Sequence, residues 1–282
     1  MILLTGATGK TGGAAAKELA GKGPLRAIVR NADKAKALKD MGVELVVGDV
    51  GDPESLKKAM TGVEQALLVL PNGEHQERLE MQFVDVAKAS GVKKIVKVSS
   101  IEAAPDSKLA MQRLHCKVED HIKASGLAWT MVKPSFFMAN FFANAATIKA
   151  NGTIVMPGGK GKIGMIDNRD IGAVIAHVMT TSGHDSKNYL ISGPEALTFS
   201  DAAQAFSEVL GKTVVYIDQP VADFEAMLAK FLPAWHAHEV AALFGGIAEG
   251  TLDIVTPTVK ELLGRDPISL KQFIKDNIVV FK

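Results

Sequence analysis

The sequence contains a single cysteine, Cys116, among its 282 residues. One thiol excludes an internal disulfide, so we expect a reducing compartment. No apolar run approaches the roughly 18 residues that span a bilayer. The first residues also lack the basic region, long apolar region and small-residue cleavage site of a secretory signal. We therefore expect a cytoplasmic protein that does not contact a membrane.

An excess of charge of either sign is also missing. Lysine and arginine number 32 and aspartate and glutamate number 31, which gives a formal net charge of +1. Such a balance supplies no global field for nucleic acid, so we expect no direct nucleic-acid partner. No histidine, cysteine or acidic cluster has metal-ligand spacing, and His236 and His238 would point about 200° apart on a helix. We expect no metal site.

Short apolar runs alternate with helical stretches through the first half of the chain. The runs are nearly continuous in apolar residues, which is typical of parallel strands buried on both faces. Asp52 and Pro53 have the residue types of a helix N-cap and a first helical position. This order predicts a doubly wound parallel α/β sheet, the Rossmann architecture. We expect strands at residues 1–5, 24–29, 43–47, 65–70, 93–98 and 128–133.

The pattern changes after Pro134. We expect a smaller, mostly helical C-terminal substrate lobe in addition to the sheet. The expected elements are a helix at 135–152, a short hairpin at 153–164, a helix at 168–181, a seventh strand at 188–192 and mostly helices from residue 194. The predicted domains are 1–135 with 164–193 for nucleotide binding, and 136–163 with 194–282 for the substrate lobe.

Glycines recur at every third position between the first strand and the first helix. We expect Gly6 to permit a tight turn, Gly9 to leave room for a pyrophosphate, and Gly12 to let the helix approach the strand. An ordinary glycine-rich turn is the alternative, and the spacing is not that of a Walker loop. The strand–loop–helix context favours a dinucleotide site. Its predicted contacts here are Gly6, Thr8, Gly9, Lys10, Thr11 and Gly12.

The end of the second strand indicates which dinucleotide is preferred, because an acidic residue there binds the ribose hydroxyls of NAD. This chain has Arg30 at that position, with Lys34 one turn later. A guanidinium group pairs with a 2′-phosphate and stacks on adenine, so we expect NADP(H) to be preferred and NAD(H) to remain usable. The alternative is that these charges form a solvated helix face.

Later strand ends supply the other predicted cofactor contacts. Asp49 follows the third strand and is expected near the adenine, unless it is only a turn or helix-capping residue. The fourth and fifth strands end in LLVLPNG and VKVSS, where the ribose and the nicotinamide should pass. The remaining predicted contacts are Val50, Leu70, Pro71, Asn72, Ser99, His115, Pro134 and Phe136.

Several segments taken together resemble the NmrA-like family of atypical short-chain dehydrogenase/reductases. They are TGATGKTGG, VRNADKAKAL, GDVGDPESL, IVKVSSIEA, ASGLAWTMVKPSFFMANF and IDNRDIGAV, in the expected order over at least residues 1–210. The resemblance implies a Rossmann fold and is greatest to NAD(P)H quinone reductases and triphenylmethane-dye reductases. The family also includes proteins that bind NADP(H) without turning it over and regulate transcription factors.

The Tyr-x-x-x-Lys pair of the wider superfamily is missing. The only tyrosines, Tyr189 and Tyr216, are not followed four residues later by lysine. Aligning the helix expected at 107–125 on Glu119 places Met111 at the tyrosine position and His115 at the lysine position. Carbonyl–alcohol chemistry and sugar-nucleotide epimerisation are therefore disfavoured.

Hydride transfer to a quinone or a cationic dye does not need that pair, because the hydride enters a delocalised system. Water or His115 can complete the protonation, since an unperturbed histidine titrates near pH 6.5. His115 is thus the one catalytic candidate, and it could also bind the nicotinamide ribose. The alternative is a histidine that only fills a helix face beside Glu119.

Phenylalanines gather after Pro134, and we expect them to line a flat apolar pocket for a small conjugated acceptor. Phe136 and Phe137 should lie nearest the nicotinamide because they leave the sixth strand first. Helix packing is the alternative, since neighbouring residues cannot all face one way. The predicted substrate contacts are Phe137, Met138, Phe141 and Met156.

Two functions remain open at this point. The first is an NAD(P)H-dependent reductase of quinones or similar conjugated acceptors, and the second is a regulatory protein that senses NADP(H) through a protein partner. The missing catalytic pair is compatible with both. A homodimer is compatible with the sequence but is not required by it.

Overall fold

The computed structural model describes all 282 residues and divides them into two compact units. The first unit contains residues 1–133 and 168–190, and the second contains residues 134–167 and 191–282. The sequence placed the corresponding divisions after residues 135, 163 and 193. None of the helices combines the length and the apolar character that a membrane span requires.

A seven-stranded sheet forms the centre of the first unit, in the order β3-β2-β1-β4-β5-β6-β8. The strands from β3 to β6 in this order pair in parallel. Bonds from Ser186 N–H to Trp129 O and from Ser135 N–H to Ile191 O make β8 parallel to β6 as well. The predicted parallel sheet and its seventh strand are confirmed. The strands are β1 (Ile2–Leu4), β2 (Leu25–Val29), β3 (Glu44–Val47), β4 (Gln65–Leu68), β5 (Lys94–Val98), β6 (Ala128–Pro134) and β8 (Lys187–Ile191).

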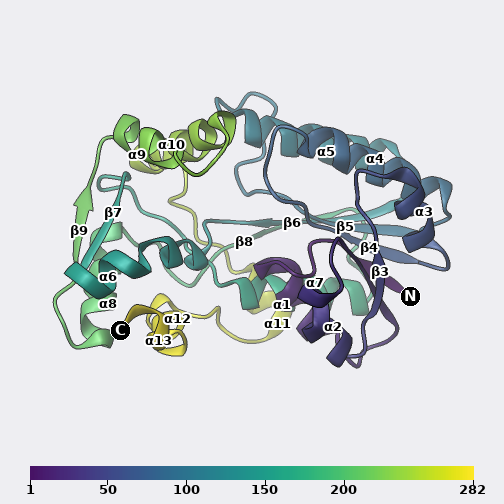
Figure 1. Ribbon diagram of the computed structural model, residues 1–282, viewed down its shortest axis with the longest axis horizontal. Helices are drawn as coiled ribbons and strands as arrows, with labels where there is room; N and C mark the ends of the chain where they lie inside the picture. Colours follow the sequence, from purple (N-terminus) through teal and green to yellow (C-terminus); the bar gives the residue numbers. More distant parts are fainter. The chain divides into compact units, whose positions relative to one another are not determined.

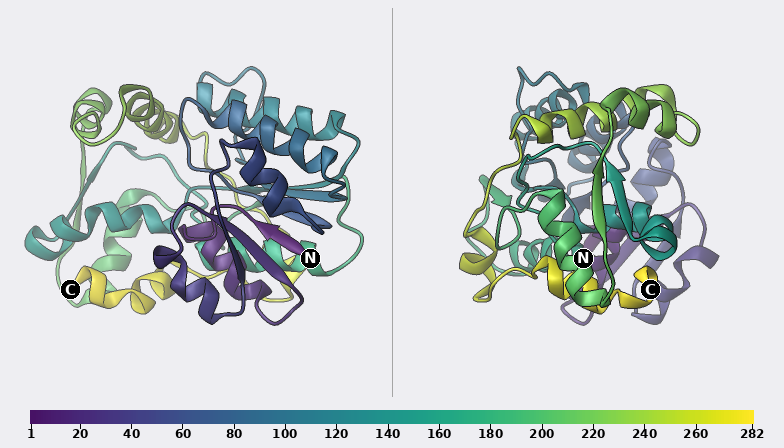
Figure 2. Two further views of the ribbon diagram at one scale, coloured as in Figure 1. Left: turned by 45° about the vertical axis from the view of Figure 1, so that its right-hand side comes forward. Right: turned by 90° about the vertical axis from the view of Figure 1, so that its left-hand side faces the viewer.

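Helices cover both faces of this sheet (Figure 1; Figure 2, left). One face carries α3 (Pro53–Met60), α4 (Gln76–Ala89) and α5 (Ala110–Ala124), and the other carries α1 (Lys10–Leu19), α2 (Lys36–Asp40) and α7 (Asn168–Thr180). The core beneath α3, α4 and α5 is built from side chains such as Leu56, Phe83 and Ile95. Asp52 accepts the N–H groups of Glu54 and Ser55 ahead of Pro53, which confirms the predicted cap.

The second unit contains a two-stranded parallel sheet, β7 (Thr153–Met156) and β9 (Val215–Asp218), visible in Figure 2, right. The predicted hairpin at 153–164 is therefore wrong. The chain does turn there, with the N–H of Gly161 bonded to Gly158 O, but the residues after the turn do not pair with β7. Gly161 and Gly164 serve close packing, because a Cβ on either would collide with a backbone carbonyl oxygen. The helices are η2 (Met138–Asn144, a 3-10 helix), α6 (Ala145–Asn151), α8 (Phe199–Leu210), α9 (Val221–Leu228), α10 (Ala234–Ala248), α11 (Thr258–Leu263), α12 (Leu270–Asp276) and α13 (Ile278–Phe281).

Candidate functional site

The glycine loop between β1 and α1 is a tight turn that leaves no room for side chains at two of its glycines. Gly6 has a φ of 59°, and a Cβ there would lie 2.6 Å from Val69 O. A Cβ on Gly12 would collide with Gly6 O, so this glycine lets α1 approach the loop. The predicted roles of Gly6 and Gly12 are confirmed. The role of Gly9 in admitting a pyrophosphate stays a prediction.

The start of α1 is suited to an anion. Its N-cap residue, Gly9, offers no side-chain cap, and its first turn contains no acidic residue. The N-cap residue therefore supplies no side-chain acceptor to the N–H groups of that turn, which lie at the positive end of the helix dipole. Thr8, Gly9 and Lys10 are exposed. A dinucleotide pyrophosphate fits these groups in charge and in hydrogen-bonding type.

Thr5, which sequence reasoning missed, fixes the loop to the neighbouring strand. Its Oγ1 lies 3.0 Å from Leu67 O and accepts the N–H of Val69 at 2.8 Å. These bonds join the ends of β1 and β4, where the strand order changes direction. Ligands of open α/β sheets bind at this switch point. A threonine directly before the first glycine was the available signal.

Helix α7 packs against the first half of α1 and fixes its position. Asn168 Nδ2 donates to Thr11 Oγ1 over 2.9 Å, and both side chains are buried. Gly172 permits the close approach, because a Cβ there would lie 2.6 Å from the carbonyl carbon of Ala14. The sequence analysis did not identify Asn168 or Gly172, although a glycine inside a helical pattern is a signal of close packing.

The side chains expected at the adenosine end of the site lie on the surface. Arg30 directly follows β2 and is exposed, as is Lys34. Asn31 Oδ1 accepts the N–H groups of Asp33 and Lys34 and so begins the short 3-10 helix η1 (Asp33–Ala35). This turn keeps Arg30 at the carboxyl end of β2. Contact with a 2′-phosphate stays a prediction.

Other predicted contacts also follow strand ends. Asp49 Oδ1 accepts the N–H of Gly51 over 2.7 Å, so the turn alternative for Asp49 is observed and its adenine contact stays a prediction. After β4, Leu70 is half-buried while Pro71 and Asn72 are exposed. Val50 is half-buried.

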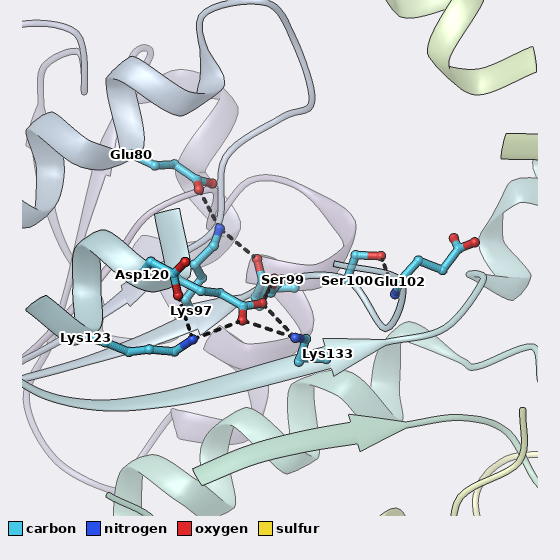
Figure 3. Close-up of polar contacts among 10 residues, drawn as sticks. Glu80, Lys97, Ser99, Ser100, Glu102, Asp120, Lys123 and Lys133 are labelled. Atoms are coloured by element: carbon cyan, nitrogen blue, oxygen red, sulfur yellow. Dashed lines mark hydrogen bonds and ion pairs between the residues drawn. The ribbon is translucent and has the colours of Figure 1, made fainter. Parts of the chain in front are cut away.

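A cluster of charged side chains lies between β5 and the helices α4 and α5 (Figure 3). Alternation along β5 turns Lys97 and Ser99 to the same face. Lys97 is fully buried, and its Nζ pairs with the equally buried Glu80 of α4. Glu80 also accepts the side-chain N–H of Gln76 over 3.1 Å. Lys97 is therefore neutralised inside the unit.

Glu119 of α5 forms the second part of this cluster. Its carboxylate accepts the hydroxyl of Ser99 over 2.5 Å and pairs with Lys133 Nζ at 3.0 Å. Lys123 Nζ lies 3.8 Å from the same carboxylate. Figure 3 shows Ser99, Lys123 and Lys133 turned toward one another. Sequence reasoning used Glu119 only for alignment and missed Lys133.

His115 lies one turn before Glu119 on the same face of α5. It is 7% exposed, and its buried Nδ1 has no hydrogen-bond partner. Burial holds the pKa of His115 well below its ordinary value, and the positive charges of Lys97 and Lys133 lower it further. The imidazole is thus neutral near pH 7 and cannot serve as a cationic proton donor there. Ribose binding by His115 stays a prediction.

The aromatic residues after Pro134 pack in the second unit. The ring of Phe136 meets those of Phe199 and Phe244 edge-on, and Phe141 meets Phe199 and Phe206 in the same way. Packing explains the burial of Phe136 and Phe141, and Met138 and Met156 are buried too. Phe137 is only half-buried. Acceptor contact stays a prediction, for which Phe137 offers the most accessible side chain of this set.

Comparisons with known proteins match the chain along its length. It is 34% identical to an NAD(P)H azoreductase of Xenophilus azovorans, with 100% of this chain and 99% of the relative covered. The structure of the NADPH-dependent quinone oxidoreductase QOR2 of Escherichia coli, complexed with NADPH, superposes with a TM-score of 0.89, at 30% identity and coverage of 99% and 100%. The structure of triphenylmethane reductase of Citrobacter sp., complexed with NADP(H), superposes with a TM-score of 0.88 at 29% identity. The match covers 98% of this chain and 99% of the reductase.

The family model of the NmrA-like family matches residues 1–273. This match confirms the resemblance inferred from the motifs. The matched range includes the glycine loop, the charged cluster between β5, α4 and α5, and both segments of the first unit. The chain belongs to the NmrA-like family.

Proposed function

We propose that this chain is an NAD(P)H-dependent oxidoreductase that transfers hydride to a small conjugated acceptor of the quinone, azo or cationic-dye class. The observation that carries the proposal is a phosphate-compatible glycine loop at the switch point of a parallel sheet, in a chain that matches an NAD(P)H azoreductase over its whole length. The QOR2 and triphenylmethane reductase neighbours, both complexed with NADP(H) or NADPH, support the same activity.

We choose a conjugated acceptor because the charged cluster between β5, α4 and α5 contains no strong proton donor. Lys97 and Lys133 are each paired with a glutamate, and His115 is neutral near pH 7. None of the three is a strong proton donor. A bound reduced nicotinamide supplies the hydride, and a conjugated acceptor distributes the incoming charge so that water can complete protonation. Isolated ketones, which need a positioned acid, are poor substrates on this account.

Arg30 gives the site its preference for NADP(H). Its exposed guanidinium stands at the end of β2, where a site that prefers NAD has a carboxylate for the ribose hydroxyls. We expect it to pair with the 2′-phosphate, which NADH lacks. Lys34, on the first turn beyond, adds positive charge at the same end of the site.

The test is the rate of NADPH and NADH oxidation at 340 nm against quinones, azo dyes and cationic dyes. R30A should raise KM for NADPH about tenfold, the value of a charge-assisted hydrogen bond, and leave KM for NADH nearly unchanged. K36A removes an exposed lysine at the start of α2 and is the matched control. Equal effects of R30A on both cofactors would contradict the assignment of Arg30. Tight NADPH binding without turnover of any acceptor would favour the sensing function instead.

A further inference from the structure

The hydroxyl of Ser99 acts as the donor in its hydrogen bond to Glu119. Its partner, the carboxylate of Glu119, lies between the ammonium groups of Lys133 and Lys123 at 3.0 and 3.8 Å. A carboxylate in that position is ionised and only accepts hydrogen bonds. Ser99 must therefore be the donor in the 2.5 Å bond to Glu119, and its single hydroxyl proton is used there.

With its proton used, Ser99 Oγ can take part in a further hydrogen bond only as the acceptor. No protein group donates to it, because its only side-chain bond is the one to Glu119. The backbone of Ser99 is fixed as well, since its N–H donates to Val132 O on the neighbouring strand over 2.8 Å. The residue keeps 6% of its surface exposed directly after β5. Ser99 thus stands at the carboxyl edge of the sheet with a hydroxyl oxygen that can still accept a hydrogen bond.

Strand order places Ser99 on one side of the switch point. The glycine loop follows β1, Arg30 follows β2 on one side, and Ser99 follows β5 on the other side beyond β4. A dinucleotide whose pyrophosphate lies on the glycine loop and whose adenosine half lies toward β2 directs its nicotinamide half toward β5.

We propose that Ser99 is a hydrogen-bond acceptor for the nicotinamide nucleoside half of the cofactor, and that Glu119 is the positioning residue that gives Ser99 this polarity. This inference rests on the proposed function. The group recognised is an O–H or N–H donor, either a ribose hydroxyl or the carboxamide N–H. Phosphate and carbonyl oxygens, which only accept, do not satisfy it.

The experiment measures the Kd of NADP⁺ by titration calorimetry for the wild type, S99A, E119Q and the double variant. S99A should weaken binding about fivefold to tenfold, the value of one neutral hydrogen bond. E119Q should weaken it similarly, because a glutamine amide donates to Ser99 and releases the hydroxyl proton toward the ligand. The double variant should bind no more weakly than S99A alone, because Glu119 acts only through Ser99.

Three controls separate positioning from a general loss of structure. The probe 2′,5′-ADP lacks the nicotinamide half, so its Kd should be unchanged in every variant. S99T retains the hydroxyl and should bind NADP⁺ like the wild type. D120N alters the exposed acid next to Glu119 on α5 and should have no effect. The 3-acetylpyridine analogue of NADP⁺, which lacks the carboxamide N–H, distinguishes the two donors: S99A weakens its binding only if the ribose hydroxyl is recognised.

An unchanged Kd for NADP⁺ in S99A would overturn the inference, as would normal binding by E119Q alongside weakened binding by S99A. Equal weakening of NADP⁺ and 2′,5′-ADP would also overturn it, because the effect would then be structural. Failure of the proposed function gives different results: the wild type does not bind NADP⁺, or it binds NADPH and turns over no acceptor, and neither result depends on Ser99 or Glu119.

Discussion

The imidazole of His115 is held where protonation is costly. It is buried on the sheet-facing side of α5, with Lys97 on β5 and Lys133 on β6 as the cations nearby and with Glu80 and Glu119 pairing those cations. The pKa of His115 is therefore well below the ordinary value of about 6.5. His115 therefore binds a proton more weakly in the folded chain than in the unfolded chain.

This difference predicts a loss of stability in acid. His115 contributes stability above about pH 6.5, and the contribution is lost as the pH falls from there toward its lowered folded-state pKa. H115Q, which does not titrate, should remove this slope. Urea unfolding at several pH values should show the wild type losing about 1 kcal/mol per pH unit more than H115Q below pH 6.5. Parallel stability curves for the two proteins would contradict the burial of a neutral imidazole.

Single residues were predictable from sequence where their backbone position alone defines the role. Gly6, Gly12 and Asp52 were placed correctly because a loop or a helix start requires them. Thr5 and Lys133 were missed, because their roles depend on partners 62 and 14 residues away in the chain. The unperturbed titration assumed for His115 was wrong, because sequence does not show which charges a fold will bring beside a histidine.

At the scale of elements, the close pairing of α1 with α7 fixes the start of α1, where we propose that the pyrophosphate binds. Gly172 lets the two helices pack closely because it has no Cβ. The hydrogen bond from Asn168 to Thr11 joins the starts of the two helices. Sequence periodicity predicted both helices, because each has a continuous apolar face. Their contact could not be predicted, since the two are separated by most of the chain. The β7–β9 pairing was missed because residues 157–214 lie between the two strands, and periodicity does not show which distant strands pair.

The helix pair gives a matched prediction for two glycine substitutions. In G172A the new Cβ would lie 2.6 to 2.7 Å from atoms of Ala14, so the helices must separate, at a cost of about 1–3 kcal/mol in the free energy of unfolding. In G245A on α10 the nearest atom is a Val221 methyl at 3.7 Å, and better helix propensity should add about 0.5–1 kcal/mol. Urea denaturation measures both. A G172A protein as stable as the wild type would contradict the tight packing.

For the whole molecule, fold class was the most predictable property. Nearly continuous apolar strands, helices between them and a glycine loop at the first turn define a doubly wound sheet, and the family match confirms that assignment. The acceptor could not be predicted to the same depth. The surroundings of the predicted acceptor contacts, such as Phe137, arise from tertiary packing and not from any local spacing.

The central claim is that this chain passes hydride directly from bound cofactor to a conjugated acceptor. The most direct measurement is the isotope content of the product when a cationic triphenylmethane dye is reduced with (4R)- or (4S)-[4-²H]NADPH. The account predicts that one of the two labelled cofactors places a single, non-exchanging deuterium on the central carbon of the leuco dye, detected by mass spectrometry. Leuco dye without deuterium from either cofactor, or bound NADPH that is never oxidised, would contradict it.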